Sequence, residues 1–330
     1  YAEKSTRIFP QRAIHKTVSI HYELMNRFPV LIITNSASDL SKLEFPEFRI
    51  VNTKSEYFTK FLADTLVPEF SFALEIKESF EEDGKERYAI INKDLSQKFG
   101  NKKIYDAFNF LVLLFPSNLA VDHIVDFNFI DGKLKHRSSF KTDIFNEEDE
   151  GFLRFNEGKS DIINEFIKKY STTYTDIGYL KSSAQNYMNA FDNTHYYHFS
   201  YIALCISLES ITNGNTELLY RIRRNVAVIC GKDSETSQTI FDNINTIYKL
   251  RSKIVHGSDF SDEKVYQYLN YLQSIVSKTI IELLIHNIPN LELLNKKITS
   301  LGFGNRDKLS ENWTEILLND NIEKIIYEKI

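Results

Sequence analysis

Cysteine, long apolar runs and a strong charge of either sign are all scarce in this 330-residue chain, and each absence excludes a class of protein. Cys205 and Cys230, the two cysteines, lie in apolar helical stretches, so we expect reduced core residues and neither a disulfide nor a metal site. The longest apolar run, 110–115, is too short to span a membrane. The net charge of -5 gives no overall nucleic-acid signal, so any RNA contact has to be local.

Several familiar sequence signatures are also missing. No GxxxxGK[ST] or GxGxxG segment supports a P-loop or dinucleotide fold, and no repeat or low-complexity tract occurs. No secretory signal is visible, and because the sequence begins with Tyr1 we expect a segment to precede it. We therefore expect a cytoplasmic protein with no cofactor, no metal and no membrane contact.

The first half of the chain, 1–150, has the pattern of a strand-rich α+β domain. Asp131-Gly132 joins two alternating segments, 121–130 and 133–140, which is the strongest short signal for a hairpin. Periodicity leaves 104–114 open as either a buried helix or a strand. Further strands are expected at 30–34, 48–52, 70–76 and 87–91.

After the acidic stretch 147–150 the apolar period becomes that of helices, so 151–330 is expected to be an all-α domain. Gly231 and Gly257 are expected to end two helices, and Ser261 to cap the start of another. Short connections between long helices favour an antiparallel bundle. The expected helices are 160–173, 176–191, 195–213, 216–230, 237–256, 262–286, 290–300 and 310–329.

Arg251 interrupts an apolar stripe. Ile240, Ile244, Ile247 and Tyr248 recur at helical spacing, and Ile254 and Val255 are expected to continue this buried face. A guanidinium there needs a partner or a ligand, because burying an unpaired charge costs several kcal/mol. His256, just before Gly257, is expected at the last helical position, where the helix dipole favours imidazolium.

Glu209 is a second charge in an apolar helix, 203–211. Arg251 is its natural partner, and the alternative is that Glu209 lies on an exposed edge. Spacing alone also allows Arg251 and His256 to be purely structural, as a salt-bridged arginine and a C-capping histidine.

Basic residues gather on the preceding helix. Lys and Arg outnumber Asp and Glu across 216–260 by seven to five. The patch is either a solvated polar face or a phosphate-contacting groove beside Arg251. In the second case the RNA-contacting residues are Arg221, Arg223, Arg224 and Lys253.

The remaining histidines give no metal site. His195 and His198 share a helix face but lack a carboxylate partner at matching spacing, so a helix start is the favoured interpretation. A two-residue turn pairs Ile130 with Lys133, which makes His136 face Phe127 instead of His123.

Three segments, 202–209, 223–231 and 247–257, resemble the HEPN superfamily (higher eukaryotes and prokaryotes nucleotide-binding), and its Apea-like branch in particular. The block Tyr-Lys-Leu-Arg-Ser-Lys-Ile-Val-His-Gly carries most of this resemblance, which covers about 175–286. Nothing before about 150 resembles a family.

The resemblance implies an antiparallel bundle that dimerises, with an Arg-x4–6-His motif lining a cleft between protomers. Many relatives are metal-independent endoribonucleases in phage defence, toxin–antitoxin systems or RNA processing. Arg251 would then bind phosphate and His256 act as acid or base. The next position is often Asn, Asp or His in active relatives and is Ser252 here, a departure that still leaves a hydrogen-bonding group.

The expected function is therefore RNA cleavage by a homodimer, with Ser252 and Glu209 in supporting roles. The N-terminal domain is expected to bind a protein or ligand trigger. The alternative is a non-catalytic HEPN module that binds a nucleotide or partner and dimerises through the same helices.

Overall fold

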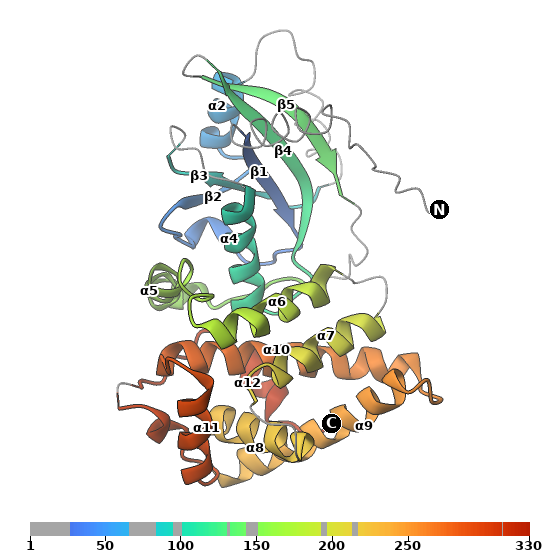
Figure 1. Cartoon of the computed structure of the whole chain (residues 1–330). Coiled ribbons are helices and arrows are strands. Elements are labelled where there is room, and N and C mark those ends of the chain that lie inside the picture. The colour runs from blue at the N-terminus through green and yellow to red at the C-terminus, as the bar shows by residue number, and fades with distance from the viewer. Residues whose placement is uncertain are drawn as a thin grey trace, which may run out of the picture. The chain divides into compact units, whose positions relative to one another are not determined.

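A computed structural model describes residues 27–65, 84–94, 101–130, 133–142, 151–192, 197–212, 217–311 and 313–330. Two compact units make up the chain (Figure 1). As far as they are described, the first takes residues up to Asn35, Glu47–Ala107 and Ala120–Ile144, and the second takes Ser36–Pro46, Phe108–Leu119 and Phe145–Ile330. The predicted domain boundary at residue 150 therefore does not separate the two units completely, because two short segments of the first half belong to the helical unit.

The first unit contains a five-stranded antiparallel sheet, ordered β2-β3-β1-β4-β5. Three of the strands expected upstream of the hairpin form close to their predicted bounds, and the segment 70–76 lies outside the described residues. The strands are β1 (Arg27–Thr34), β2 (Phe48–Asn52), β3 (Tyr88–Asn92), β4 (Ala120–Ile130) and β5 (Lys133–Lys141).

Helix α2 (Glu56–Thr65) covers one face of this sheet. Because strand side chains alternate between faces, every second residue of a strand reaches the same core. Phe58 and Phe61 of α2 pack there with strand residues that include Ile32, Val125 and Phe127. The apolar face of a short helix thus closes the core of the unit.

The β4–β5 hairpin forms with the predicted register. Ile130 pairs with Lys133, and Phe127 pairs with His136. The rings of Phe127 and His136 meet edge-to-face, with 6.1 Å between their centroids. The turn residues 131 and 132 lie outside the described part of the chain. His123 and His136 do not face each other, as expected.

The open question at 104–114 is answered by a helix, α4 (Asn101–Leu114). Its C-terminal part belongs to the second unit, where Phe110 stacks on Phe166 at 6.2 Å and contacts Tyr174 at 5.1 Å. Aromatic packing on several sides explains why this segment reads as almost continuously apolar.

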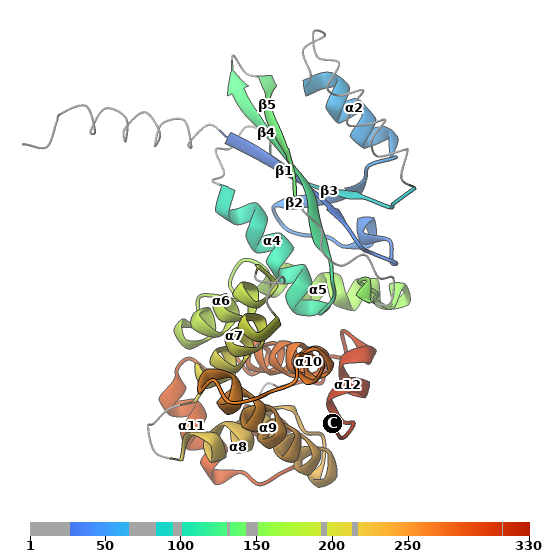
Figure 2. The ribbon, with the colours of Figure 1, turned by 90° about the vertical axis from the view of Figure 1, so that its right-hand side faces the viewer.

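The second unit is helical, and its longest helix, α10, lies between the α6–α7 pair and the α8–α9 pair (Figures 1 and 2). None of the described helices is long and apolar enough to cross a membrane. The α-helices are α5 (Ser160–Tyr170), α6 (Gly178–Asp192), α7 (Tyr197–Glu209), α8 (Leu218–Cys230), α9 (Ser234–Val255), α10 (Asp262–His286), α11 (Leu291–Ser300) and α12 (Asp320–Ile326). Short 3-10 turns are η1 (Leu40–Lys42), η3 (Glu157–Lys159) and η4 (Arg306–Leu309).

The prediction of a helix over 310–329 was wrong, since α12 begins only at Asp320, capped by Asn319. The stretch before it is non-helical and brings side chains onto α10. Trp313 donates from its indole Nε1 to Glu282 at 2.8 Å.

A stripe of charge on α10 receives those side chains. Lys278, Glu282 and His286 follow one another at four-residue spacing and are all buried, with Glu282 fully inaccessible. Lys278 Nζ lies 2.9 Å from Glu282 Oε1, and Arg306 Nη1 lies 3.7 Å from the same oxygen. Both cations hold the pKa of the Glu282 carboxyl below its ordinary value, against the opposing effect of burial.

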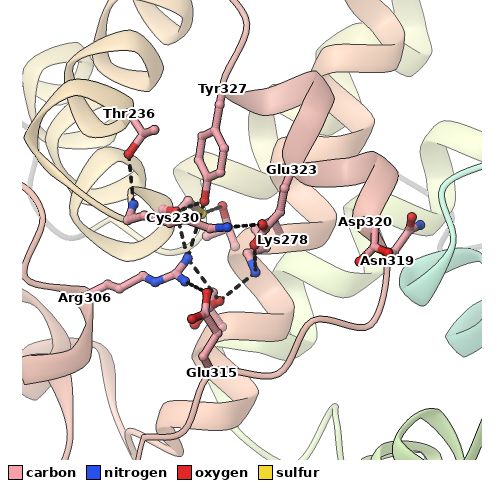
Figure 3. A network of polar contacts seen from close by, with 12 residues as sticks. Cys230, Thr236, Lys278, Arg306, Glu315, Asn319, Asp320, Glu323 and Tyr327 are labelled. Atoms are coloured by element: carbon pink, nitrogen blue, oxygen red, sulfur yellow. Dashed lines mark hydrogen bonds and ion pairs between the residues drawn. The ribbon is translucent and has the colours of Figure 1, made fainter. Parts of the chain in front are cut away.

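The stripe is part of a wider polar network (Figure 3). Glu323 of α12 contacts Lys278 at 3.2 Å, while Arg306 also pairs with Glu315 and donates to the Cys230 carbonyl at 3.2 Å. Buried charges are stable only when each is paired. The network therefore ties the chain beyond α11 to α8 and α10.

His286 predicts how stability depends on pH. Burial lowers its pKa to about 4, while Glu282 and Arg306 nearby act in opposite directions. Between pH 6.5 and 4 the unfolded chain binds a proton that the folded chain excludes. The free energy of unfolding therefore decreases as the pH is lowered through this window. The loss reaches about 3 kcal/mol near pH 4.

We expect His286→Asn, which keeps a polar atom toward Ser310, to flatten this slope in urea unfolding measured at pH 4 to 7. Gln267→Asn, a neutral substitution at an exposed position of the same helix, serves as the control and should keep the slope of the parent. An unchanged slope in His286→Asn would contradict the assignment.

Candidate functional site

Helix α9 carries the Arg251–His256 motif, and both of its ends are capped. Asp233 and Thr236 form a reciprocal capping box, which starts the helix three residues before the predicted 237. At the other end Gly257 is left-handed, with φ 66°. Ser258 N donates to Lys253 O at 2.9 Å and Gly257 N to Ile254 O at 3.3 Å, which is the Schellman arrangement.

The first part of the predicted apolar stripe is buried, and tyrosines fix it to α7. Tyr201 of α7 donates to the Ile247 carbonyl at 3.0 Å, and Tyr248 of α9 donates to the Cys205 carbonyl at 3.0 Å. Burial raises the pKa of both phenols, so they stay neutral donors. The sequence marked Tyr248 only as an apolar residue, because its acceptor lies 43 residues away.

The last turn of α9 does not follow the prediction. Ile254 is only half-buried and Val255 is 45% exposed, so the buried stripe ends at Leu250. No described element covers the helix beyond that point closely enough to bury it. The motif therefore lies on an open surface of the helical unit.

Arg251 and Glu209 form the predicted ion pair, with Arg251 Nη2 3.4 Å from Glu209 Oε1. Both side chains are half-buried, at 29% and 22% exposure. The Arg251 Nε is buried without a hydrogen-bond partner among the described residues. The guanidinium is thus held by one carboxylate and remains partly exposed.

The other residues of the motif are exposed. His256 is the C-cap of α9, and Ser252 and Lys253 also face solvent. From Arg251 to His256 the helix rises by about 7.5 Å. The imidazole and the guanidinium therefore lie on one accessible end of α9, the first at the tip and the second beside Glu209.

Two arginines of the predicted RNA-contacting patch make intramolecular contacts. Arg224 donates to Ile298 O and Leu301 O, both at 2.7 Å, at the C-terminus of α11. Arg223 lies 3.8 Å over the ring of Phe241 and donates to its carbonyl at 2.9 Å. These contacts favour a structural role for both side chains, and Arg221 is half-buried on the same helix.

Metal coordination has no support within the described ranges, where no group of three or more His, Cys, Asp or Glu could hold an ion. The rings of His198 and Phe199 lie 4.4 Å apart and tilted by 45°, and His195 lies outside those ranges. Both cysteines are buried and free, and burial raises the pKa of each thiol.

Comparison with protein-family models, with curated proteins and with solved structures gives no match for this chain.

The contacts of Arg224 predict a stability effect. Arg224→Ala leaves the last carbonyls of α11 without their charged donor, and we expect it to lower the free energy of unfolding by about 2 kcal/mol. Arg224→Lys keeps the charge but loses the fork that reaches two carbonyls, so most of the loss should remain. Urea unfolding measures both changes.

Lys253→Ala, which removes an exposed charge, is the control and should change stability by less than about 0.5 kcal/mol. If Arg224→Ala is as stable as the parent, the structural role is wrong and Arg224 becomes a candidate RNA-contacting residue again.

Proposed function

We propose that the helical unit is a HEPN-type endoribonuclease that cleaves RNA without a metal ion, as a homodimer in the cytoplasm. The observation that carries this proposal is the state of Arg251. Its guanidinium is paired with Glu209 yet remains 29% exposed, close to the exposed end of α9 that bears His256. A phosphate is a natural ligand for a guanidinium that is oriented and still partly accessible.

The proposed reaction is transesterification within RNA. The 2′-oxygen forms a bond to the adjacent phosphorus, the bond to the 5′-oxygen breaks, and the products are a 2′,3′-cyclic phosphate and a 5′-hydroxyl. One group removes the 2′-proton and another protonates the leaving oxygen. His256 suits either role, and Arg251 suits the charge that develops on the phosphate.

Two protomers supply what one chain lacks. A single imidazole serves poorly as base and acid in the same turnover, whereas a dimer offers two. Exposed apolar side chains on α9 and on its neighbours α7 and α10 support this arrangement. Phe199 and Ile206 on α7, Val255 on α9 and Tyr266 on α10 are each more than one-third exposed, and apolar side chains are enriched at the cores of homodimer interfaces.

In this proposal Glu209 positions Arg251, and Ser252 contributes a hydroxyl beside the phosphate. The sheet unit would bind the ligand or protein that releases the nuclease, as expected for phage defence or a toxin. The alternative is a HEPN module that binds a nucleotide or a partner without catalysis. Both use an accessible His256, and RNA cleavage separates them.

Cleavage of mixed RNA in EDTA tests the chemistry. We expect the parent to cleave, and Arg251→Ala and His256→Ala each to lose activity by about 100-fold or more. Lys249→Ala removes an exposed charge from the same helix and should cleave like the parent. Growth arrest on expression, relieved by the same two variants, gives a second measurement in cells.

Equal cleavage by the parent and both motif variants would refute the proposed ribonuclease site. Thermal melting of each variant confirms that it folds. A parent that neither cleaves RNA nor arrests growth supports the non-catalytic alternative.

The dimer makes a separate prediction. Ile206→Glu puts a charge on the exposed face of α7, so we expect it to yield monomers by light scattering and to lose cleavage. Ile162→Glu, on α5, makes the same change at a position that is 50% exposed and should leave both properties unchanged. A monomer with full ribonuclease activity would refute the shared site.

A further inference from the structure

Two tyrosines link helices α7 and α9 through reciprocal hydrogen bonds. Tyr201 of α7 donates from its hydroxyl to the Ile247 carbonyl of α9 at 3.0 Å, and Tyr248 of α9 donates to the Cys205 carbonyl of α7 at 3.0 Å. Tyr201 is fully buried and Tyr248 is 7% exposed. Each helix therefore holds the backbone of the other at one defined turn.

Both acceptors belong to a helical turn that ends in a charged residue of the candidate site. In an α-helix the amide of each residue donates to the carbonyl four residues before it. The Ile247 carbonyl therefore accepts from the amide of Arg251, and the Cys205 carbonyl accepts from the amide of Glu209. The two hydroxyls thus bind the same carbonyls that anchor the backbone of the ion pair.

The Tyr248 hydroxyl also lies close to both charges. Burial raises the pKa of this phenol, the Cys205 thiol and the Glu209 carboxylate raise it further, and the Arg251 guanidinium opposes them. Arg251 Nη2 and Glu209 Oε1 are 3.4 Å apart. The ion pair is therefore immediate neighbour to the hydrogen bonds that join the two helices.

Other tyrosines of the helical unit make hydrogen bonds that the backbone needs. Tyr187 donates to the Val112 carbonyl at 3.1 Å, and Pro116 leaves this carbonyl without the amide donor four residues on. Tyr327 donates at 2.9 Å to the carbonyl of Cys230, the last residue of α8, where helical carbonyls lack an intrahelical donor. In both cases the hydroxyl supplies a donor that the helix itself does not.

Satisfying the backbone does not explain the hydroxyls of Tyr201 and Tyr248, because their acceptors already have a helical donor. Phenylalanine would fill the same space without a buried hydroxyl that needs a partner. What the hydroxyls add is a fixed register between α7 and α9 at the turns that carry the two charges. The ion pair depends on this register, since sliding one helix along the other changes the distance between the charged groups.

We propose that Tyr201 and Tyr248 are positioning residues, which hold Arg251 and Glu209 at the separation that phosphate binding requires. This inference rests on the proposed function for its effect on the reaction rate, and on the hydrogen bonds alone for the geometry. Both hydroxyls are bound to backbone inside the unit, so each acts through the helix that it holds. Small displacements of a catalytic group lower the rate of the chemical step strongly.

Steady-state cleavage of a short fluorogenic RNA, taken from a site that the parent cleaves, tests the effect on the rate. We expect Tyr201→Phe and Tyr248→Phe each to lower kcat about ten-fold while KM stays within about two-fold, because the RNA still binds but the guanidinium is misplaced in the transition state. Tyr187→Phe removes an equally buried hydroxyl, whose acceptor lies in α4, and is the matched control. It should lower the melting temperature at least as much as the other two variants and keep the kcat of the parent.

A second comparison separates positioning from a general loss of packing. In a Glu209→Gln background the partner of Arg251 is already altered, so we expect Tyr248→Phe to lower kcat there by less than about two-fold. A hydroxyl that only stabilised the fold would have the same effect in both backgrounds. Equal factors in the two backgrounds, or losses of kcat no larger than that of Tyr187→Phe, overturn the inference.

The inference and the proposed ribonuclease fail separately. If the parent cleaves and both phenylalanine variants retain its kcat, the ribonuclease stands and the positioning role is refuted. If the parent cleaves nothing, the ribonuclease is refuted and crystal structures of the two variants judge the positioning. We then expect Arg251 Nη2 and Glu209 Oε1 to lie more than about 4 Å apart, against 3.4 Å in the parent. An unchanged distance refutes the positioning role.

Discussion

The helical unit depends on the buried carboxylate of Glu282. A charge with no solvent access is stable only if cations reach it, because removing one partner of a buried pair costs several kcal/mol. Lys278 supplies one cation from the same helix, but Arg306 and Trp313 must come from the chain beyond α11. The C-terminal segment therefore has to fold onto α10 before the core of the unit is complete.

That constraint extends to the helix with the candidate site. Arg306 and Tyr327 both donate to the carbonyl of Cys230, just before α9 begins. Asn243, within α9, donates to Glu328 O at 2.7 Å and accepts from Ile330 N at 3.2 Å. The N-terminal half of α9 is thus held from one side by the C-terminal segment, and its middle is held by the tyrosines shared with α7. The exposed end carries Arg251 and His256 on a rigid support, as precise placement of functional groups requires.

Local signals predicted most of the helices, and the errors come from overlooked local patterns and from contacts between residues far apart in the sequence. The bounds of α10 follow from Ser261 and the acidic first turn, and the end of α9 follows from Gly257. The start of α9 was placed too late because the Asp233–Thr236 box was overlooked, although its spacing is visible in the sequence. Lys278, Glu282 and His286 also stand at four-residue spacing in an apolar stretch, a sign of the buried network that was likewise overlooked. The roles of Arg223 and Arg224 were not predictable, since the carbonyls that Arg224 contacts lie more than 70 residues away. Assignment of 36–46 and 108–119 to the helical unit likewise rests on tertiary packing alone.

Arg306 provides an internal reference for Arg251. The side chain of Arg306 is 4% exposed, and its guanidinium contacts two carboxylates, a carbonyl and the ring of Trp313. This is how a structural arginine is accommodated in this fold.

Arg251 is 29% exposed, has one carboxylate partner at 3.4 Å and retains an unused Nε. If stability were the only constraint, a second acceptor for the guanidinium would be favoured, or an aliphatic side chain in place of Arg251. A guanidinium that is oriented by one carboxylate and still 29% exposed is instead what a phosphate ligand requires, because the phosphate can then contact the exposed part without displacing Glu209.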